Sequence, residues 1–351
     1  MKKEKILIFN ISTDPSDTSL GFAINWLNQL SEYYVEIDVV TLNKGESRLL
    51  NENINIYSHD SVNLNRITKF IALRKIIKHL VKNNEYKFCL SHMTASLTLV
   101  GSTIFRFKNL QSILWYTHKG PTTIVKKIVL YLGALLSSTI ITASEKSFPL
   151  KLKKVTSIGH AINYEDFYRS RIDPKSKDFL ILSRIARSKN IDASIQGFLD
   201  SVYGESQSIT IVGGPLTKQD TVYEDYLKNK YSEYPNIRFA GSVPHIDISK
   251  YIDETGFHIN NTPMGFYDKS VLETLSGGII NFYMNSDYDK NIHSEYIKIL
   301  KFDGTKEALT KCINLISELE KDKLIEIIKF SQEKVKDESL KTLHHRILKV
   351  I

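Results

Sequence analysis

The chain has 351 residues, of which 42% are hydrophobic and 25% charged, a composition typical of a soluble globular protein with room for two domains. No run of about 18 uncharged apolar residues is present, so we expect no membrane-spanning helix, and MKKEK at the start lacks the apolar core and cleavage site of a signal peptide. Only two cysteines, Cys89 and Cys312, occur, which excludes a disulfide framework and a cysteine-based metal site and indicates a cytoplasmic protein.

The net charge of +8 is concentrated in the first half of the chain. Residues 61–144 contain 12 lysines and arginines but a single acidic residue, Glu85. A region of one sign of charge attracts an anionic partner, which could be a nucleic acid, an acidic membrane surface or a phosphorylated substrate. Interleaved aromatic residues and a recognisable nucleic-acid-binding module are both missing, so we rank the nucleic-acid partner last.

Short β-rich runs alternate with helical patterns through the first half, which predicts βαβ units and a parallel sheet. Segment 128–143 is strongly apolar, and we expect a buried helix followed by a buried strand there. The expected strands are 5–10, 35–42, 88–91, 112–116 and 139–144, and the expected helices are 21–31, 66–83, 95–107 and 122–136.

The second half repeats this pattern and ends in about 45 helical residues with apolar spacing near 3.6. We expect a boundary in the polar segment 169–178, which separates an N-terminal domain (1–168) from a C-terminal domain (169–335), with 336–351 packing back on the first. The predicted fold is α/β, with two doubly wound Rossmann-like domains facing a cleft, and ligands expected beyond the carboxyl ends of the strands. The expected strands are 179–183, 208–213, 236–241, 256–260 and 278–284.

Three loops that follow strands of the second half carry candidate ligand-binding residues. Arg184 and Lys189 lie between a strand and a helix, where two cations and a helix N-terminus suit a diphosphate, although solvated surface charges would give the same pattern. Gly213 and Gly214 end the next strand, but no complete GxGxxG is present, so a structural role is the better interpretation. Ser270 and Glu273 have the spacing of a helix-capping box, and Glu273 is therefore either a cap or a ligand-binding carboxylate.

The order of these segments resembles a GT-B glycosyltransferase of the family-4 type, a group of retaining enzymes that use sugar-nucleotide donors. The resemblance covers nearly the whole chain. It rests on ILSRIARSKNID with its two cations, ITIVGG, IRFAGSVPHIDISKYI, SVLETLSGG at the end of an E-x7-E motif, and the segments TASEKSFPL and KVTSIGHAINYEDF, which resemble the family's join between domains.

The resemblance implies a donor site in the second domain and an acceptor side in the first. Arg184 and Lys189 would bind the donor diphosphate and stabilise the departing nucleotide, and Glu273 would accept hydrogen bonds from the ribose. Backbone around Val243 would meet the base, Gly214 belongs to the glycine-rich turn, and the helix start at Lys269 and Ser270 would offer N–H groups to the phosphates. The family generally needs neither a bound metal nor another cofactor.

Two residues of the first half also match the family. His118 follows the strand 112–116 and resembles the cleft histidine that contacts the donor sugar, although a hydrogen-bonded surface imidazole would look the same. Gly21 lies where the family carries glycines near the donor phosphates. One position departs from the pattern: Gly265 stands eight residues before Glu273, where the first glutamate of E-x7-E would face the transferred sugar.

The predicted function is therefore transfer of a sugar from a UDP- or GDP-sugar to an acceptor hydroxyl, in glycan, polysaccharide or glycolipid synthesis. The alternative, favoured by Gly265, is a catalytically impaired GT-B-like protein that binds a nucleotide or glycan. The amphipathic segment 66–83 has a basic side, which fits either a core-packing helix or contact with an anionic membrane. Because relatives with lipid-linked acceptors carry a basic first domain, we expect a cytoplasmic protein with peripheral contact at the inner face of the membrane.

Overall fold

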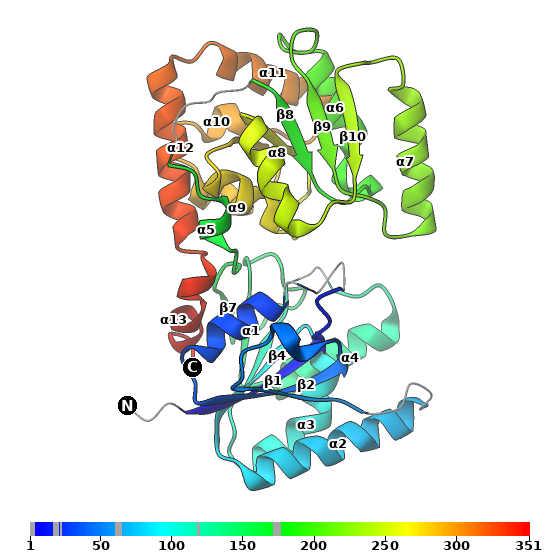
Figure 1. The fold of residues 1–351 in the computed structure, drawn as a ribbon, viewed down its shortest axis with the longest axis vertical. Coiled ribbons are helices and arrows are strands. Elements are labelled where there is room, and N and C mark those ends of the chain that lie inside the picture. Colours follow the sequence, from blue (N-terminus) through cyan, green and yellow to red (C-terminus); the bar gives the residue numbers. More distant parts are fainter. Residues whose placement is uncertain (1–3, 17–20, 22, 60–64, 118–119, 171–176) are drawn as a thin grey trace. The chain divides into compact units, whose positions relative to one another are not determined.

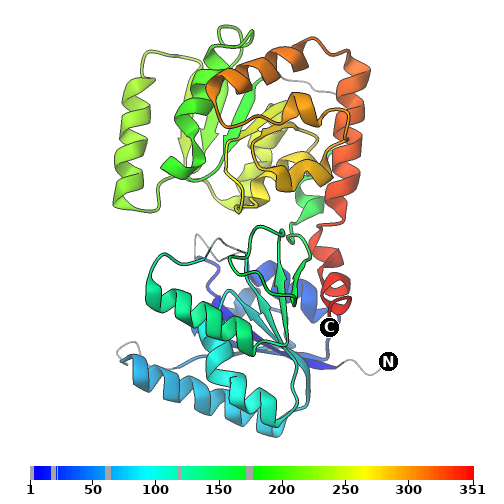
Figure 2. The same ribbon diagram turned by 180° about the vertical axis from the view of Figure 1, so that it is seen from behind.

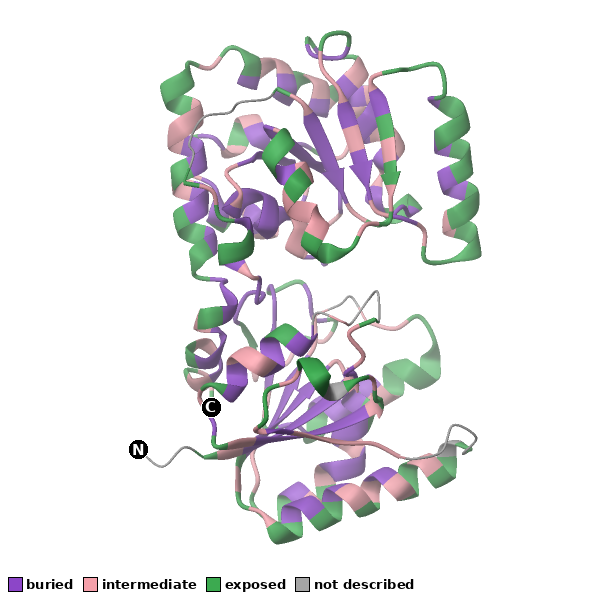
Figure 3. Cartoon of the chain, viewed as in Figure 1, coloured by how far each residue is buried: buried purple, intermediate pink, exposed green. Residues whose placement is uncertain are grey.

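The computed structural model describes residues 4–16, 21, 23–59, 65–117, 120–170 and 177–351. The chain forms two compact units, each built on its own parallel sheet (Figure 1). The first unit comprises Met1–Ala161 together with Leu340–Ile351, and the second comprises Ile162–Ser339. The inner strands of both sheets are buried, whereas three of the four edge strands are partly exposed (Figure 3), so the middle of each sheet is the centre of its own hydrophobic core.

The first unit contains a seven-stranded parallel sheet in the order β3-β2-β1-β4-β5-β6-β7. The strand order reverses at β1. Strands β2 and β3 follow on one side of β1, and β4 to β7 follow on its other side. The strands are β1 (Lys5–Ser12), β2 (Glu36–Asn43), β3 (Ile54–Tyr57), β4 (Tyr86–His92), β5 (Ser112–Trp115), β6 (Thr139–Thr142) and β7 (Val155–Ser157).

Helices cover both faces of this sheet. On one face α1 (Ala23–Ser31) packs beside α13 (Leu343–Leu348), and Leu27 and Leu343 share one core with Ile6 and Ile8 of β1. On the other face lie α2 (Arg66–Asn83), α3 (Ala95–Phe107) and α4 (Ile124–Leu136), visible together in Figure 2. A short 3-10 helix, η1 (Ser47–Leu49), precedes β3. The last residues of the chain therefore complete the core of the first unit.

The expectation that residues 128–136 form a buried helix is wrong. Within α4 only Leu130, Gly133 and Ala134 are buried, and they pack on α3 and the sheet. Gly133 lies so close to Ala95 that a β-carbon at that position would be 2.7 Å from its carbonyl oxygen. Because of this close approach, only a narrow row of α4 residues packs against the rest of the unit. The opposite side of the helix stays exposed, although it is apolar too.

The second unit contains a five-stranded parallel sheet in the order β10-β9-β8-β11-β12. Alternate residues of β8 face opposite sides: Leu180 and Leu182 pack with Ile252, whereas Phe179 packs against Phe198 with the two rings tilted. The strands are β8 (Phe179–Leu182), β9 (Ile209–Val212), β10 (Ile237–Gly241), β11 (Phe257–Asn260) and β12 (Ile280–Tyr283).

The helices of the second unit lie on both faces of its sheet and end at the return to the first unit. Helix α11 packs on α6, where Thr310 donates a hydrogen bond to the Gly197 carbonyl (3.0 Å). The helices are α5 (Tyr164–Phe167), α6 (Ile191–Leu199), α7 (Lys218–Lys230), α8 (Ile248–Glu254), α9 (Lys269–Ser276), α10 (Ile297–Leu300), α11 (Lys306–Ser317) and α12 (Lys321–Lys336). The 3-10 turns of this unit are η2 (Arg187–Lys189), η3 (His245–Asp247) and η4 (Ser286–Asn291). A further 3-10 turn, η5 (Leu340–Thr342), belongs to the first unit.

The predicted fold class is confirmed, since both sheets are parallel and both are covered by helices. Each expected strand and helix of the first half is present, and α2 and α3 have the predicted bounds. Two short strands, β3 and β7, were missed. Strand β7 has only three residues, too few for a period-two pattern, and β3 lies in the asparagine-rich run NENINIY, where asparagine disfavours strands.

Candidate functional site

The candidate donor residues lie on loops at one edge of the second unit's sheet. Because the five strands are parallel, their carboxyl ends meet at that edge. The order reverses at β8, which has β9 on one side and β11 on the other. The loops after these strands therefore flank the switch point, which is where ligands bind in sheets of this kind.

Arg184 is the exposed cation of this edge. It follows the carboxyl end of β8 by two residues, and its neighbours Ile185 and Ala186 are buried. The Ile185 N–H donates to the Gly214 carbonyl (2.9 Å), which ties the loop after β8 to the loop after β9. Among the described residues, none forms a hydrogen bond or ion pair with the Arg184 guanidinium, so an anion could bind it without displacing a polar partner.

Lys189, in contrast, is engaged in a buried polar cluster. Its Nζ lies 2.6 Å from Oδ2 of Asp268 and 3.3 Å from the Thr262 hydroxyl, and the side chain is only 8% exposed. The same Asp268 oxygen accepts hydrogen bonds from Thr262 (2.8 Å) and Asn260 (3.1 Å). Burial alone would raise the pKa of Asp268, but the charge of Lys189 and these hydrogen bonds hold it below its ordinary value.

Glu273 is a buried carboxylate whose partner is a histidine. Its Oε1 lies 3.0 Å from Nε2 of His245, which follows β10 and is half exposed. The hydrogen bond to Glu273 raises the pKa of His245 despite partial burial. The capping box predicted from Ser270 and Glu273 is wrong: α9 begins at Lys269 with Asp268 as its N-cap, so Ser270 already lies inside the helix.

Lys269 and Ser270 form the first turn of α9 and are both partly buried. Removal from water lowers the pKa of the Lys269 ammonium to about 8, although the negative charge of Glu273 acts in the opposite direction. The first backbone N–H groups of a helix have no partner within the helix. The start of α9 therefore places these N–H groups and a lysine with an unusually low pKa in the loop region after β11.

Gly214 and Val243 lie on the two neighbouring loops. Ser242, Val243 and Pro244 follow β10 and form one wall of an open hollow of about 390 Å³ on the surface. The Ser242 side chain lies directly against Gly214, which links the loops after β9 and β10. The other residues lining the hollow come from η3 and α8: Asp247, Lys250, Tyr251 and Glu254.

Gly265 has a backbone conformation that explains its residue type. Its φ of +89° lies in the left-handed region, which side chains with a β-carbon adopt at a cost. A glutamate at this position would therefore strain the loop. The first glutamate of the E-x7-E motif is therefore absent from a loop whose backbone conformation favours glycine. The departure from the family motif involves the loop conformation as well as the side chain.

Two predicted residues belong to the first unit. The Gly21 carbonyl accepts a hydrogen bond from the N–H of Ile24 (3.3 Å) at the start of α1. His118 lies outside the described residues.

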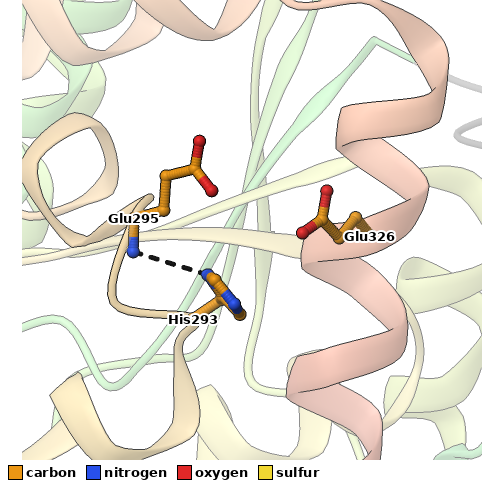
Figure 4. A group of neighbouring side chains, drawn as sticks. All are labelled: His293, Glu295 and Glu326. Atoms are coloured by element: carbon orange, nitrogen blue, oxygen red, sulfur yellow. Dashed lines mark hydrogen bonds between the residues drawn. The ribbon is translucent and has the colours of Figure 1, made fainter.

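One group of side chains among those described could hold a metal ion, namely His293, Glu295 and Glu326 (Figure 4). Its members lie on the segment after η4 and on α12. Glu326 already accepts hydrogen bonds from Tyr296 (2.9 Å) and Lys323 (3.2 Å), and the Glu295 N–H faces Nδ1 of His293 (3.4 Å). These partners compete with a metal ion.

An Asp-x-Asp pair, Asp287 and Asp289, occurs within η4, and sequence inspection missed it. Asp289 is paired with Lys301 (2.8 Å) and also accepts a hydrogen bond from Tyr283 (3.1 Å), so its carboxylate has protein partners.

Sequence reasoning also missed His245 and the role of Asp268. His245 is a titratable residue immediately after Pro244, and that position beside a predicted base-binding stretch was the available signal. Asp268 was visible as an acidic residue at a helix start. Its pairing with Lys189, 79 residues earlier, had no local signal because it depends on β8 lying beside β11.

Solved structures with this fold include several glycosyltransferases. HepE from Anabaena, solved with UDP and glucose, matches 99% of this chain and 100% of its own with a TM-score of 0.73 and 13% identity. A sucrose-phosphate synthase from Thermosynechococcus elongatus matches 99% and 98% of the two chains, with a TM-score of 0.75 and 13% identity. A glycosyltransferase from Rickettsia africae matches 100% and 98%, with a TM-score of 0.76 and 13% identity.

The sequence matches no protein-family model and no curated protein. Structural similarity at such low sequence identity establishes a fold and leaves the activity to be argued from the site. With two parallel sheets covered by helices, this chain has the GT-B fold of two Rossmann-like domains.

Proposed function

We propose that the protein is a retaining glycosyltransferase that moves a sugar from a nucleotide-sugar donor, UDP- or GDP-linked, to an acceptor hydroxyl. The observation that carries this proposal is the unpartnered, exposed guanidinium of Arg184 at the sheet's switch point, on the same edge as the buried carboxylate of Glu273. A cation for phosphates and a carboxylate for ribose hydroxyls are what a nucleoside diphosphate requires. The structures of HepE with UDP support the nucleotide.

In this proposal Arg184 and Lys189 stabilise the negative charge that develops on the departing nucleotide diphosphate. Preformed charges aimed at a leaving group lower the barrier to transfer. The N–H groups of Lys269 and Ser270 at the start of α9 add a partial positive charge. Lys189 Nζ has three N–H donors, of which Asp268 and Thr262 take two, and the third is left for a phosphate oxygen.

Glu273 would bind the ribose through Oε2, since Oε1 is held by His245. The backbone at Val243 would meet the base, Gly214 and Gly21 would border the phosphates, and His118 would contact the transferred sugar. The resemblance to family-4 enzymes supports these roles, retention at the anomeric carbon, independence from metal ions, and a saccharide or lipid-linked acceptor in polysaccharide or glycolipid synthesis.

Calorimetric titration with UDP, GDP and their sugar derivatives tests the donor site. Arg184→Ala should weaken binding of the preferred nucleotide at least about tenfold, the scale of one charge-assisted hydrogen bond. Arg187→Ala is the matched control, because this exposed arginine of the same loop lies over the Tyr223 ring (5.0 Å). Equal affinity in wild type and Arg184→Ala, or binding of no nucleotide, would refute the site.

A second measurement separates transfer from binding. Donor hydrolysis or transfer to saccharide acceptors, followed by NMR of the product's anomeric proton, reports both turnover and stereochemistry. Retention supports the proposal, and an inverted product contradicts it. Nucleotide binding without turnover of any donor would instead identify a GT-B-like binding protein, the function that Gly265 favours.

A further inference from the structure

The outward side of α4 is covered by large apolar side chains. Their exposed fractions run from 42% for Leu132 to 74% for Ile124. With 3.6 residues per turn, they lie on one side of the helix, opposite its three buried residues. The seven residues are Ile124, Val125, Ile128, Tyr131, Leu132, Leu135 and Leu136, and we call them the α4 apolar face.

This arrangement is the reverse of an ordinary surface helix. A helix on a soluble protein buries its apolar stripe and presents charged side chains to water. The α4 apolar face contains no charged residue, and the two lysines of the helix, Lys126 and Lys127, lie in its first turn outside that face. Contiguous exposed apolar surface of this kind marks a place where a protein partner or a lipid surface binds.

The surroundings of the face are basic. Helices α2, α3 and α4 cover the same side of the sheet and together contain nine lysines and arginines but no aspartate or glutamate. Helix α2 exposes three further apolar side chains in its first two turns, Ile67 (71%), Phe70 (46%) and Ile71 (47%). The exposed lysines of α2 include Lys75, Lys78 and Lys82. An apolar helix face beside helices that carry basic but no acidic residues is complementary to anionic lipid headgroups above an acyl layer.

A second copy of this chain is a poor occupant. A twofold dimer through the α4 apolar face would bring the same surface together with itself. Such a dimer would bring together two surfaces of the same sign of charge, because α2, α3 and α4 together carry nine lysines and arginines and no acidic residue, and like charges repel. The helices are also too short or too polar to cross a bilayer: none of those described meets the length and hydropathy that a membrane span requires.

We propose that the α4 apolar face docks on an anionic lipid surface, with Lys126 and Lys127 at the headgroups and the leucines, isoleucines and Tyr131 in the interfacial layer. This inference goes beyond the proposed function because it needs no assumption about the donor. It also differs from what segment 66–83 predicted, since α4 carries most of the apolar contact. Such docking is reversible and lies in the plane of the membrane rather than across it.

Flotation of the full chain with phosphatidylcholine vesicles, with or without phosphatidylglycerol, tests this proposal. The wild type should float with the anionic vesicles. Ile128→Asp with Leu135→Asp should lower the vesicle affinity at least about tenfold, because two large apolar side chains are lost and two anions are added. Val222→Asp on α7 is the matched control, since Val222 is 66% exposed but lies in the other unit. Lys126→Glu with Lys127→Glu should remove the preference for anionic vesicles.

The results that overturn the proposal are equally definite. Vesicle affinity of the α4 double variant equal to that of Val222→Asp would overturn it, as would a wild type that binds neither vesicle. Light scattering that shows a dimer which Ile128→Asp dissociates would assign the face to a second copy. Tryptophan fluorescence serves as the folding control of the α4 variants, because Trp26 and Trp115 both lie in the first unit with α4. This control does not depend on nucleotide binding, so failure of the lipid proposal and failure of the donor site are distinguishable.

Discussion

Asp268→Ala should destabilise the second unit by about 3–5 kcal/mol, because it leaves the Lys189 ammonium buried without its counter-charge. The Lys189 side chain is only 8% exposed, so water can replace the carboxylate to a small extent at most. The substitution also removes the common acceptor of Thr262 and Asn260. For a domain of this size, a loss of about 3 kcal/mol lowers Tm by roughly 6–12 °C.

Lys189→Met should cost less, because the Asp268 side chain keeps two hydrogen-bond donors and is 21% exposed. The double variant Asp268→Ala, Lys189→Met should be more stable than Asp268→Ala alone, since the uncompensated charge is gone. We expect the two substitutions to couple by about 1–3 kcal/mol in a double-mutant cycle.

Urea unfolding followed by far-UV circular dichroism measures these differences, and tryptophan fluorescence supplies an internal control. Both tryptophans, Trp26 and Trp115, lie in the first unit, so their fluorescence reports that unit. Two results would refute the argument that the buried unpaired ammonium dominates the loss of stability. One is a larger loss for Lys189→Met than for Asp268→Ala, and the other is a loss below about 1 kcal/mol for Asp268→Ala.

The pair also has a pH signature. Because the pKa of Asp268 is lower in the folded protein, its contribution is complete above the ordinary value of about 3.9 and declines as the pH falls through the folded pKa. The difference in stability between wild type and Asp268→Ala should therefore shrink below about pH 4. A difference that stays constant down to pH 2 would contradict this assignment.

Three further outcomes are expected at the same sheet edge. His245→Ala should lower stability by up to ~1 kcal/mol at pH 6 and little at pH 9. Because the pKa of His245 is raised in the folded protein, its pair with Glu273 is fully stabilising below about pH 6.5, and this contribution is lost as the pH rises through the folded pKa. Identical urea unfolding curves for wild type and variant at pH 6 would contradict it. Gly265→Ala should cost about 1–2 kcal/mol in urea unfolding because of its φ of +89°, and a neutral effect would count against that conformation. Glu273→Gln should weaken UDP binding about tenfold by calorimetry, whereas unchanged affinity would exclude it from the ribose.

The alternation of strands and helices was decided by the sequence, since period-two and period-3.6 apolar patterns report how neighbouring residues share a face. The strand-end positions of Arg184, Gly214 and Val243 follow from the same patterns, because parallel strands place their carboxyl ends at one edge. The three-residue strand β7 was too short for this signal.

Contacts between distant segments were decided only by the tertiary structure. Lys189 and Asp268 meet because β8 lies beside β11, and Glu273 meets His245 because α9 lies near the loop after β10. Helix α4 is apolar on nearly every side, so its pattern could not indicate which side packs. The close contact of Gly133 with Ala95 determines which side of α4 packs on α3, and the α4 apolar face stays exposed. Packing depends on the shape of the neighbouring helix as well as on hydropathy.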